Sequence, residues 1–167
     1  DPAERQRAFD MVVRQLYCAK MLGAETILVI PGSVSVSFVP EWPTVSYDVV
    51  YERALEAMKK LAPVAEEYGV EIGMENVWNK FLLSPIEMRA LIDEIGSDYV
   101  GAYFDTGNVV INGYPEQWIR ILGKRIKKVH FKDYRRDPGG INAFVDLLAG
   151  DVDWREVRKA FEEIGYE

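Results

Sequence analysis

Apolar residues in this chain alternate between helical spacing and short continuous runs. Residues 3–22 repeat apolar positions every three or four residues, which is typical of a helix packed on one face. The short runs are rich in β-branched residues and bounded by turn residues, which indicates buried strands. The expected strands are 26–30, 70–75, 99–105 and 126–131, and the other expected helices cover 46–68, a segment from Pro85, 115–122 and 153–164.

Strands that alternate with helices at one helix per step favour a parallel sheet. We therefore expect an α/β fold, with residues 1–167 forming a single domain. Four strands with about five helices fit either an α/β barrel that lacks several units or a small open sheet. The chain stops at Gly165-Tyr166-Glu167, where the alternation calls for another strand.

A stretch rich in Ser, Val and Pro, residues 33–44, follows the first expected strand. Loops of this length are uncommon in compact domains and often serve as lids or binding loops. Phe38 and Trp42 are therefore candidate lid residues. In the helix that follows, Pro63 is expected to introduce a kink or a break.

Composition narrows the possible partners. The net charge of −7 disfavours nucleic acid, because binding to phosphate backbones depends on clustered Lys and Arg. No apolar run approaches the roughly 20 residues that span a bilayer, and no signal-peptide pattern opens the chain, so we expect a cytoplasmic protein without membrane contacts. The single cysteine, Cys18, excludes an internal disulfide and a cysteine zinc cluster, and it is expected in the core.

Three polar residues stand at the carboxyl ends of expected strands: Glu75, Asp105 and His130. Alone, each has an ordinary interpretation, as a paired carboxylate, a turn-forming Asp or a hydrogen-bonded core His. Together they mark the edge of a parallel sheet where ligands bind. Carboxylates suit Mg²⁺ and Mn²⁺, and an imidazole also permits Co²⁺ or Zn²⁺. We therefore expect an open, catalytic site for one divalent cation.

Further polar residues follow these three along the chain. Lys132 lies two residues after His130 and would share its face if the strand continued. Arg135 and Arg136 in the next loop are either solvated charges or donors to a substrate hydroxyl, carboxylate or phosphate. Trp78 either covers a substrate face or packs in the interior.

Three segments carry a resemblance to a known family. They are Gly73-Met74-Glu75-Asn76-Val77-Trp78-Asn79, Tyr103-Phe104-Asp105-Thr106-Gly107-Asn108 and Val129-His130-Phe131-Lys132-Asp133. In order and spacing they resemble the sugar (phosphate) isomerase/epimerase branch of the xylose-isomerase-like TIM barrels. This branch includes D-tagatose 3-epimerase-like, L-xylulose-5-phosphate 3-epimerase-like and hexulose-6-phosphate isomerase-like enzymes. The resemblance implies an incomplete (β/α)₈ barrel, about strands four to seven with their helices, and this favours the barrel over the open sheet.

The resemblance also implies roles for individual residues. Glu75, Asp105 and His130 would ligate one divalent metal ion, often Mn²⁺, and Glu75 would also be the catalytic acid/base. Arg136 falls where epimerases carry a substrate-binding Arg, and Asn108 falls where some relatives carry a substrate-contacting His. With Lys132, these two are the expected substrate-binding residues. The family's fourth ligand, a Glu on strand eight, has no counterpart here, because Glu167 lies too early.

The implied activity is isomerisation or epimerisation of a sugar or sugar phosphate. A proton would move next to a carbonyl through a metal-stabilised enediolate. One alternative is phosphodiester cleavage as in endonuclease IV-like barrels, but those sites need several metals and several histidines, and this chain has one His. Another is a non-catalytic barrel fragment or scaffold that self-assembles as a homo-oligomer to cover its sheet edges.

Overall fold

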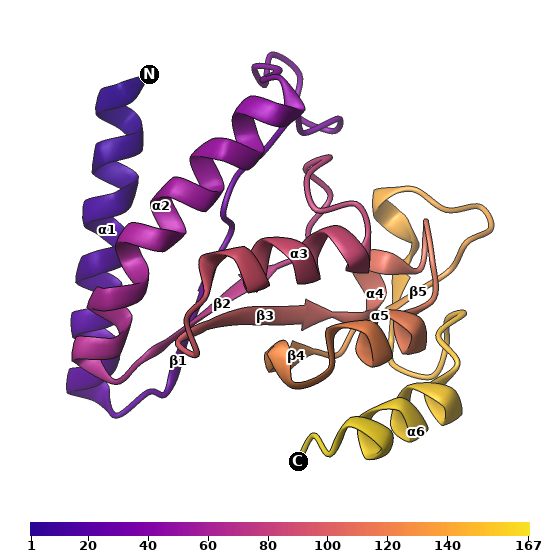
Figure 1. Ribbon diagram of the computed structural model, residues 1–167. Coiled ribbons are helices and arrows are strands. Elements are labelled where there is room, and N and C mark those ends of the chain that lie inside the picture. Colours follow the sequence, from indigo (N-terminus) through magenta and orange to yellow (C-terminus); the bar gives the residue numbers. More distant parts are fainter.

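The computed structural model describes residues 1–167 and contains a four-stranded parallel sheet with helices between successive strands (Figure 1). The strands of the sheet are β1 (Thr26–Val29), β2 (Glu71–Glu75), β3 (Val100–Asp105) and β4 (Ile126–His130). The helices are α1 (Pro2–Leu22), α2 (Tyr47–Tyr68), α3 (Pro85–Ile95), α4 (Thr106–Val109), α5 (Pro115–Leu122) and α6 (Trp154–Ile164). The expected strands and helices are confirmed to within about one residue at each end.

Several short elements were not predicted. They are the single turn α4, the 3₁₀ turns Gly123–Arg125 and Ile141–Ala143, and the antiparallel pair of β5 (Asp133–Tyr134) and β6 (Phe144–Val145). Elements of two to four residues are too short to show a hydrophobic period. All except Gly123–Arg125 belong to the loops that follow β3 and β4, so prediction was weakest close to the ends of the strands.

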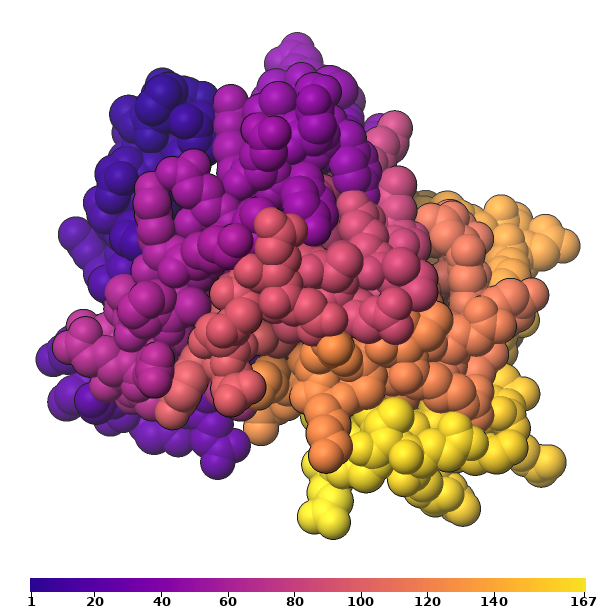
Figure 2. Space-filling model, viewed as in Figure 1, coloured from indigo at the N-terminus to yellow at the C-terminus, as the bar shows by residue number.

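The sheet order is β1-β2-β3-β4, and each strand pairs in parallel with the next one along the chain. All four carboxyl ends therefore lie at one edge of the sheet, and the arrow of β3 in Figure 1 points to this edge, toward α4. The helices also pack in chain order, α1 on α2, α2 on α3, α3 on α5 and α5 on α6. Figure 2 shows the same succession on the surface, from α1 in indigo at one end to α6 in yellow at the other.

The two faces of the sheet differ in chemistry. One face contributes Ile72, Met74, Ala102 and Phe104 to a continuous hydrophobic core, and all four are fully buried. The opposite face carries polar residues and glycines, because side chains alternate along a strand. Its members include Glu71, Gly73, Glu75, Gly101, Tyr103 and Asp105.

Glycine on the polar face makes room for larger neighbours. A Cβ on Gly73 would lie 2.9 Å from Cβ of Tyr103, and a Cβ on Gly101 would lie 2.6 Å from Cγ of Lys127. The register of β3 against β4 shifts at this point, between Ala102 and Tyr103. Lys127 extends over Gly101 and forms an ion pair with Glu71 at 2.8 Å, which joins β4 to β2 across the polar face.

Local signals explain where the helices begin and end. The hydroxyl of Ser84 accepts the N–H of Glu87 at the start of α3. Gly23, Gly69 and Gly96 end α1, α2 and α3 in the left-handed conformation, which glycine adopts without a Cβ clash. Of the two outcomes expected at Pro63, a kink or a break, the break does not occur. Pro63 is exposed, so water can hydrate the carbonyl that loses its N–H partner, and α2 continues to Tyr68.

The expectation that Cys18 lies in the core is wrong. The buried stripe of α1 passes through Leu16 and Ala19, and Cys18 lies about 100° around the helix from Ala19. Its side chain is exposed. None of the helices, α1 and α2 included, combines the length and the hydropathy needed to cross a bilayer.

Candidate metal centre

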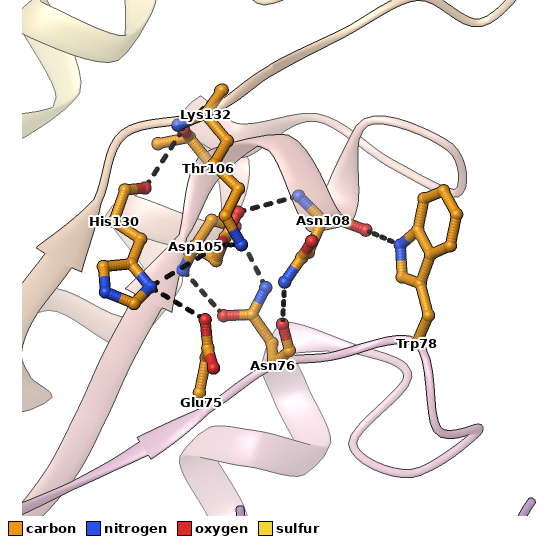
Figure 3. Close-up of polar contacts among 8 residues, drawn as sticks. All are labelled: Glu75, Asn76, Trp78, Asp105, Thr106, Asn108, His130 and Lys132. Carbon is orange, nitrogen blue, oxygen red and sulfur yellow. Dashed lines mark hydrogen bonds and ion pairs between the residues drawn. The ribbon is translucent and has the colours of Figure 1, made fainter. Parts of the chain in front are cut away.

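The structure brings Glu75, Asp105 and His130 together at the carboxyl ends of β2, β3 and β4 (Figure 3). Nδ1 of His130 lies 2.9 Å from Oε1 of Glu75 and 3.8 Å from Oδ2 of Asp105. One ligand atom from each residue lies within 4.8 Å of the others. The three residues lie together because parallel pairing aligns the ends of neighbouring strands, and Asp105 pairs directly with His130.

The chemistry of this cluster fits a divalent cation. Oδ2 of Asp105 is buried, and a carboxylate oxygen in such a place needs a charged partner. In this structure the ammonium of Lys132 compensates its charge, since the two form an ion pair at 2.6 Å. Ligands of one cation at about 2.1 Å lie roughly 3–4 Å apart, so a small side-chain rotation would complete the set. Two carboxylates and one imidazole suit Mn²⁺, Mg²⁺, Co²⁺ or Zn²⁺.

The end of β4 is fixed by a residue from α4. The hydroxyl of Thr106 accepts the N–H of Lys132 at 3.0 Å and donates to the carbonyl of Lys132 at 2.9 Å. Gly107 allows the close approach, since a Cβ there would lie 2.7 Å from Cβ of Lys132. The segment that carries His130 is thereby attached to the turn that follows Asp105.

The three expected substrate-binding residues lie in different surroundings. Lys132 contacts the cluster directly through Asp105. The amide of Asn108 donates to the carbonyl of Asn76 at 2.8 Å, so this group joins two loops. Arg136 points elsewhere: its guanidinium donates to the carbonyls of Val110 (3.0 Å) and Gly113 (3.3 Å).

Two neighbouring cavities lie beside the cluster. One, of about 480 Å³, has Asn76 in its wall, and the other, of about 570 Å³, includes Lys132. The residues that line both are Phe38, Val77, Trp78, Asn108 and Ile141. Phe38 therefore brings the long loop to the wall of both cavities, and its role as a lid residue stays a prediction. Trp42 lines neither cavity.

Asp133 was not singled out from the sequence, yet it organises the loop beside the site. It is completely buried and accepts five hydrogen bonds, from Nε1 of Trp154 (2.9 Å) and from four backbone N–H groups. These belong to Tyr134, Leu148, Gly150 and Val152. Burial alone would raise the pKa of Asp133, but these donors outweigh it and hold its pKa below the usual range. Its donors lie up to 21 residues away, so no local pattern reveals it.

A family model described as Xylose isomerase-like TIM barrel matches residues 1–167. The chain belongs to this family. Among curated relatives of this xylose isomerase-like TIM barrel, inosose dehydratase of Lacticaseibacillus casei is 26% identical over 137 residues, or 72% of this chain and 45% of that protein. D-psicose 3-epimerase of Enterocloster bolteae is 29% identical over 119 residues, or 69% of this chain and 37% of that protein. The chain thus spans less than half the length of these relatives.

Solved structures show the same fold. A D-tagatose 3-epimerase-like protein superimposes with a TM-score of 0.83 at 21% identity, covering 100% of this chain and 62% of that one. The IOLI protein, solved with a bound zinc atom, has a TM-score of 0.80 at 20% identity, covering 100% and 60%. The four parallel strands with their helices are therefore part of a xylose isomerase-like TIM barrel.

In this xylose isomerase-like TIM barrel we expect Lys132→Met to tighten Mn²⁺ binding roughly three- to tenfold, about 0.7–1.4 kcal/mol. The ammonium of Lys132 and a cation would compete for the same oxygen of Asp105. Isothermal titration calorimetry measures the change. Lys128→Met is the control, because Lys128 lies on β4, four residues before Lys132, and pairs with Glu25 instead of with the cluster. Unchanged or weaker binding by Lys132→Met would show that Lys132 does not compete with the cation.

Proposed function

We propose that this chain provides the metal-binding and proton-transfer part of a sugar or sugar-phosphate isomerase or epimerase. The observation that carries the proposal is the cluster of Glu75, Asp105 and His130, which place one ligand atom each within 4.8 Å of one another. The family supports it, since relatives include a D-psicose 3-epimerase. A small polyol with a carbonyl is the ligand class that fits.

The metal ion would be held by Glu75, Asp105 and His130, with Mn²⁺ as our first choice. When bound, a divalent cation polarises a substrate carbonyl and so acidifies the neighbouring C–H group. We propose that Glu75 takes that proton. Its Oε1 lies 2.9 Å from His130, whereas its Oε2 has no protein donor. Asp105 is less free, because its Oδ1 accepts the N–H of Asn108 and Lys132 lies against Oδ2.

A second candidate is dehydration, supported by the inosose dehydratases among the relatives. Its first step is the same removal of a proton next to a carbonyl by Glu75. The paths then divide: in epimerisation or isomerisation a proton returns to carbon, whereas in dehydration a hydroxyl on the next carbon leaves as water after taking up a proton.

The test is to incubate the chain with Mn²⁺ in D₂O and to follow the substrate by NMR. D-tagatose or D-psicose represents the epimerase substrates, and a keto-inositol represents the dehydratase substrate. Deuterium at the carbon next to the carbonyl, with all hydroxyls retained, supports the isomerase or epimerase proposal. Loss of a hydroxyl supports dehydration. No reaction, together with no Mn²⁺ binding and an oligomer on gel filtration, favours the self-assembling scaffold.

A further inference from the structure

The side chain of Asn76 extends the pairing of β2 and β3 by one residue. The backbone register of these strands ends at Glu75 opposite Tyr103. Beyond it, Oδ1 of Asn76 accepts the N–H of Asp105 at 2.9 Å, and Nδ2 donates to the carbonyl of Asp105 at 3.0 Å. A carboxamide carries the donor and acceptor of a peptide group, so here it replaces the peptide that the turning chain no longer supplies.

Asn108 closes this network from the other side. Its backbone N–H donates to Oδ1 of Asp105 at 2.9 Å, and its amide donates to the carbonyl of Asn76 at 2.8 Å (Figure 3). Both backbone groups of Asp105 and one carboxylate oxygen are then fixed. Oδ2 is the remaining oxygen: it lies 3.8 Å from Nδ1 of His130 and forms the ion pair with Lys132 at 2.6 Å.

We propose that Asn76 is a positioning residue that fixes Asp105 relative to Glu75 so that the two carboxylates can bind one metal ion. Asn76 follows Glu75 directly in the chain, so one residue links the ends of two strands that each provide a ligand. The inference rests on the proposed function of the cluster as a metal site. It assigns to Asn76 no contact with the metal or with the substrate.

Loss of this link has a specific consequence. Metal–ligand distances tolerate only about ±0.2 Å, so small movements at the end of β3 reduce affinity. Asn76 is 4% exposed, and without its amide the N–H and carbonyl of Asp105 lose their partners in a buried place. Residues that orient metal ligands contribute typically 10- to 100-fold to affinity.

The chain offers a matched control in Asn79. It lies in the same loop, is 5% exposed and also makes two side-chain hydrogen bonds. Nδ2 donates to the carbonyl of Gly32 at 2.6 Å, and Oδ1 accepts the N–H of Phe81 at 3.1 Å. Neither partner belongs to the cluster, so Asn79→Ala removes a buried carboxamide of equal size without touching Asp105.

The experiment compares Asn76→Ala and Asn79→Ala with the unmodified chain by Mn²⁺ titration calorimetry and by thermal unfolding without metal. We expect similar losses in Tm for both variants. We expect Mn²⁺ affinity to fall at least tenfold in Asn76→Ala and less than twofold in Asn79→Ala. Asn108→Ala, which removes only the donor to Asn76, should lie between them.

The outcomes separate the inference from its premise. If the unmodified chain binds no Mn²⁺, the proposed metal site fails and the role of Asn76 fails with it. If the unmodified chain binds Mn²⁺ but Asn76→Ala and Asn79→Ala lose affinity equally, only the positioning role is overturned. If Asn76→Ala does not fold, Asn108→Ala decides: affinity equal to that of the unmodified chain, at an equal Tm, overturns the inference.

Discussion

Replacing Glu75 by glutamine is expected to abolish exchange of the substrate proton next to the carbonyl, lowering its rate by about 10²–10⁴-fold. Glutamine keeps the shape of the side chain but cannot accept a proton at this position. Glu75 is 8% exposed at the end of β2, and its carboxylate points toward His130. Exchange is followed by NMR in D₂O with Mn²⁺ present, and sugar binding is measured separately by calorimetry.

Glu71→Gln is the matched control for this experiment. Glu71 lies on the same strand and the same face, four residues earlier, and pairs with Lys127 and Thr26 rather than with the cluster. The Glu71→Gln variant should exchange the substrate proton at the rate of the unmodified chain. Because Glu75 is also an expected ligand, the comparison is made at Mn²⁺ concentrations that saturate both variants. Undiminished exchange in saturated Glu75→Gln would remove Glu75 from the proton-transfer role.

Replacing Asp133 by alanine is expected to cost about 3–5 kcal/mol of unfolding free energy. Its carboxylate is the shared acceptor of five hydrogen bonds from residues 134–154, and four buried or half-buried backbone N–H groups would lose their acceptor together. Urea unfolding measures the loss. Asp146→Ala, at an exposed position in the same segment, should stay within about 0.5 kcal/mol of the unmodified chain.

Acid gives an independent check of the Asp133 prediction. The pKa of Asp133 is lower in the folded than in the unfolded chain, where an aspartate titrates near 4. A depressed pKa contributes stability that is fully present above the unfolded value and is lost as pH falls through the folded one. The stability difference between the unmodified chain and Asp133→Ala should therefore be constant from about pH 7 to 5 and shrink below about pH 4. A difference that grows in acid would contradict the assignment.

The elements of this fold were predictable because their signals are local. Apolar periodicity, β-rich runs and Gly or Ser at the ends set α1 to α6 and β1 to β4 to within about one residue, with the one-turn α4 as the exception. Cys18, and the absence of a break at Pro63, show the limit of local rules. The cost of a proline depends on whether water reaches the freed carbonyl, and the environment of Cys18 depends on which side of α1 meets α2.

The candidate ligands were predictable for a related reason. In a parallel sheet the ends of successive strands must lie side by side, so polar residues at three such ends come together whatever the loops do. Lys132 follows His130 by two residues in the chain, and its ammonium contacts Asp105 of the cluster. Arg136 did not, because the loop after β4 turns its guanidinium onto the carbonyls of Val110 and Gly113.

By itself the sequence determined the parallel α/β architecture, the family resemblance and the grouping of Glu75, Asp105 and His130. Only the tertiary structure decided how the group is held. The carboxamide of Asn76 bonds to Asp105, and the hydroxyl of Thr106 bonds to the backbone of Lys132. Asp133 accepts hydrogen bonds from the loop that follows it. These contacts join residues 15 to 29 positions apart in the chain. Hydrogen bonds are directional and short, so they depend on where each loop closes, and hydrophobic periodicity carries no information about that.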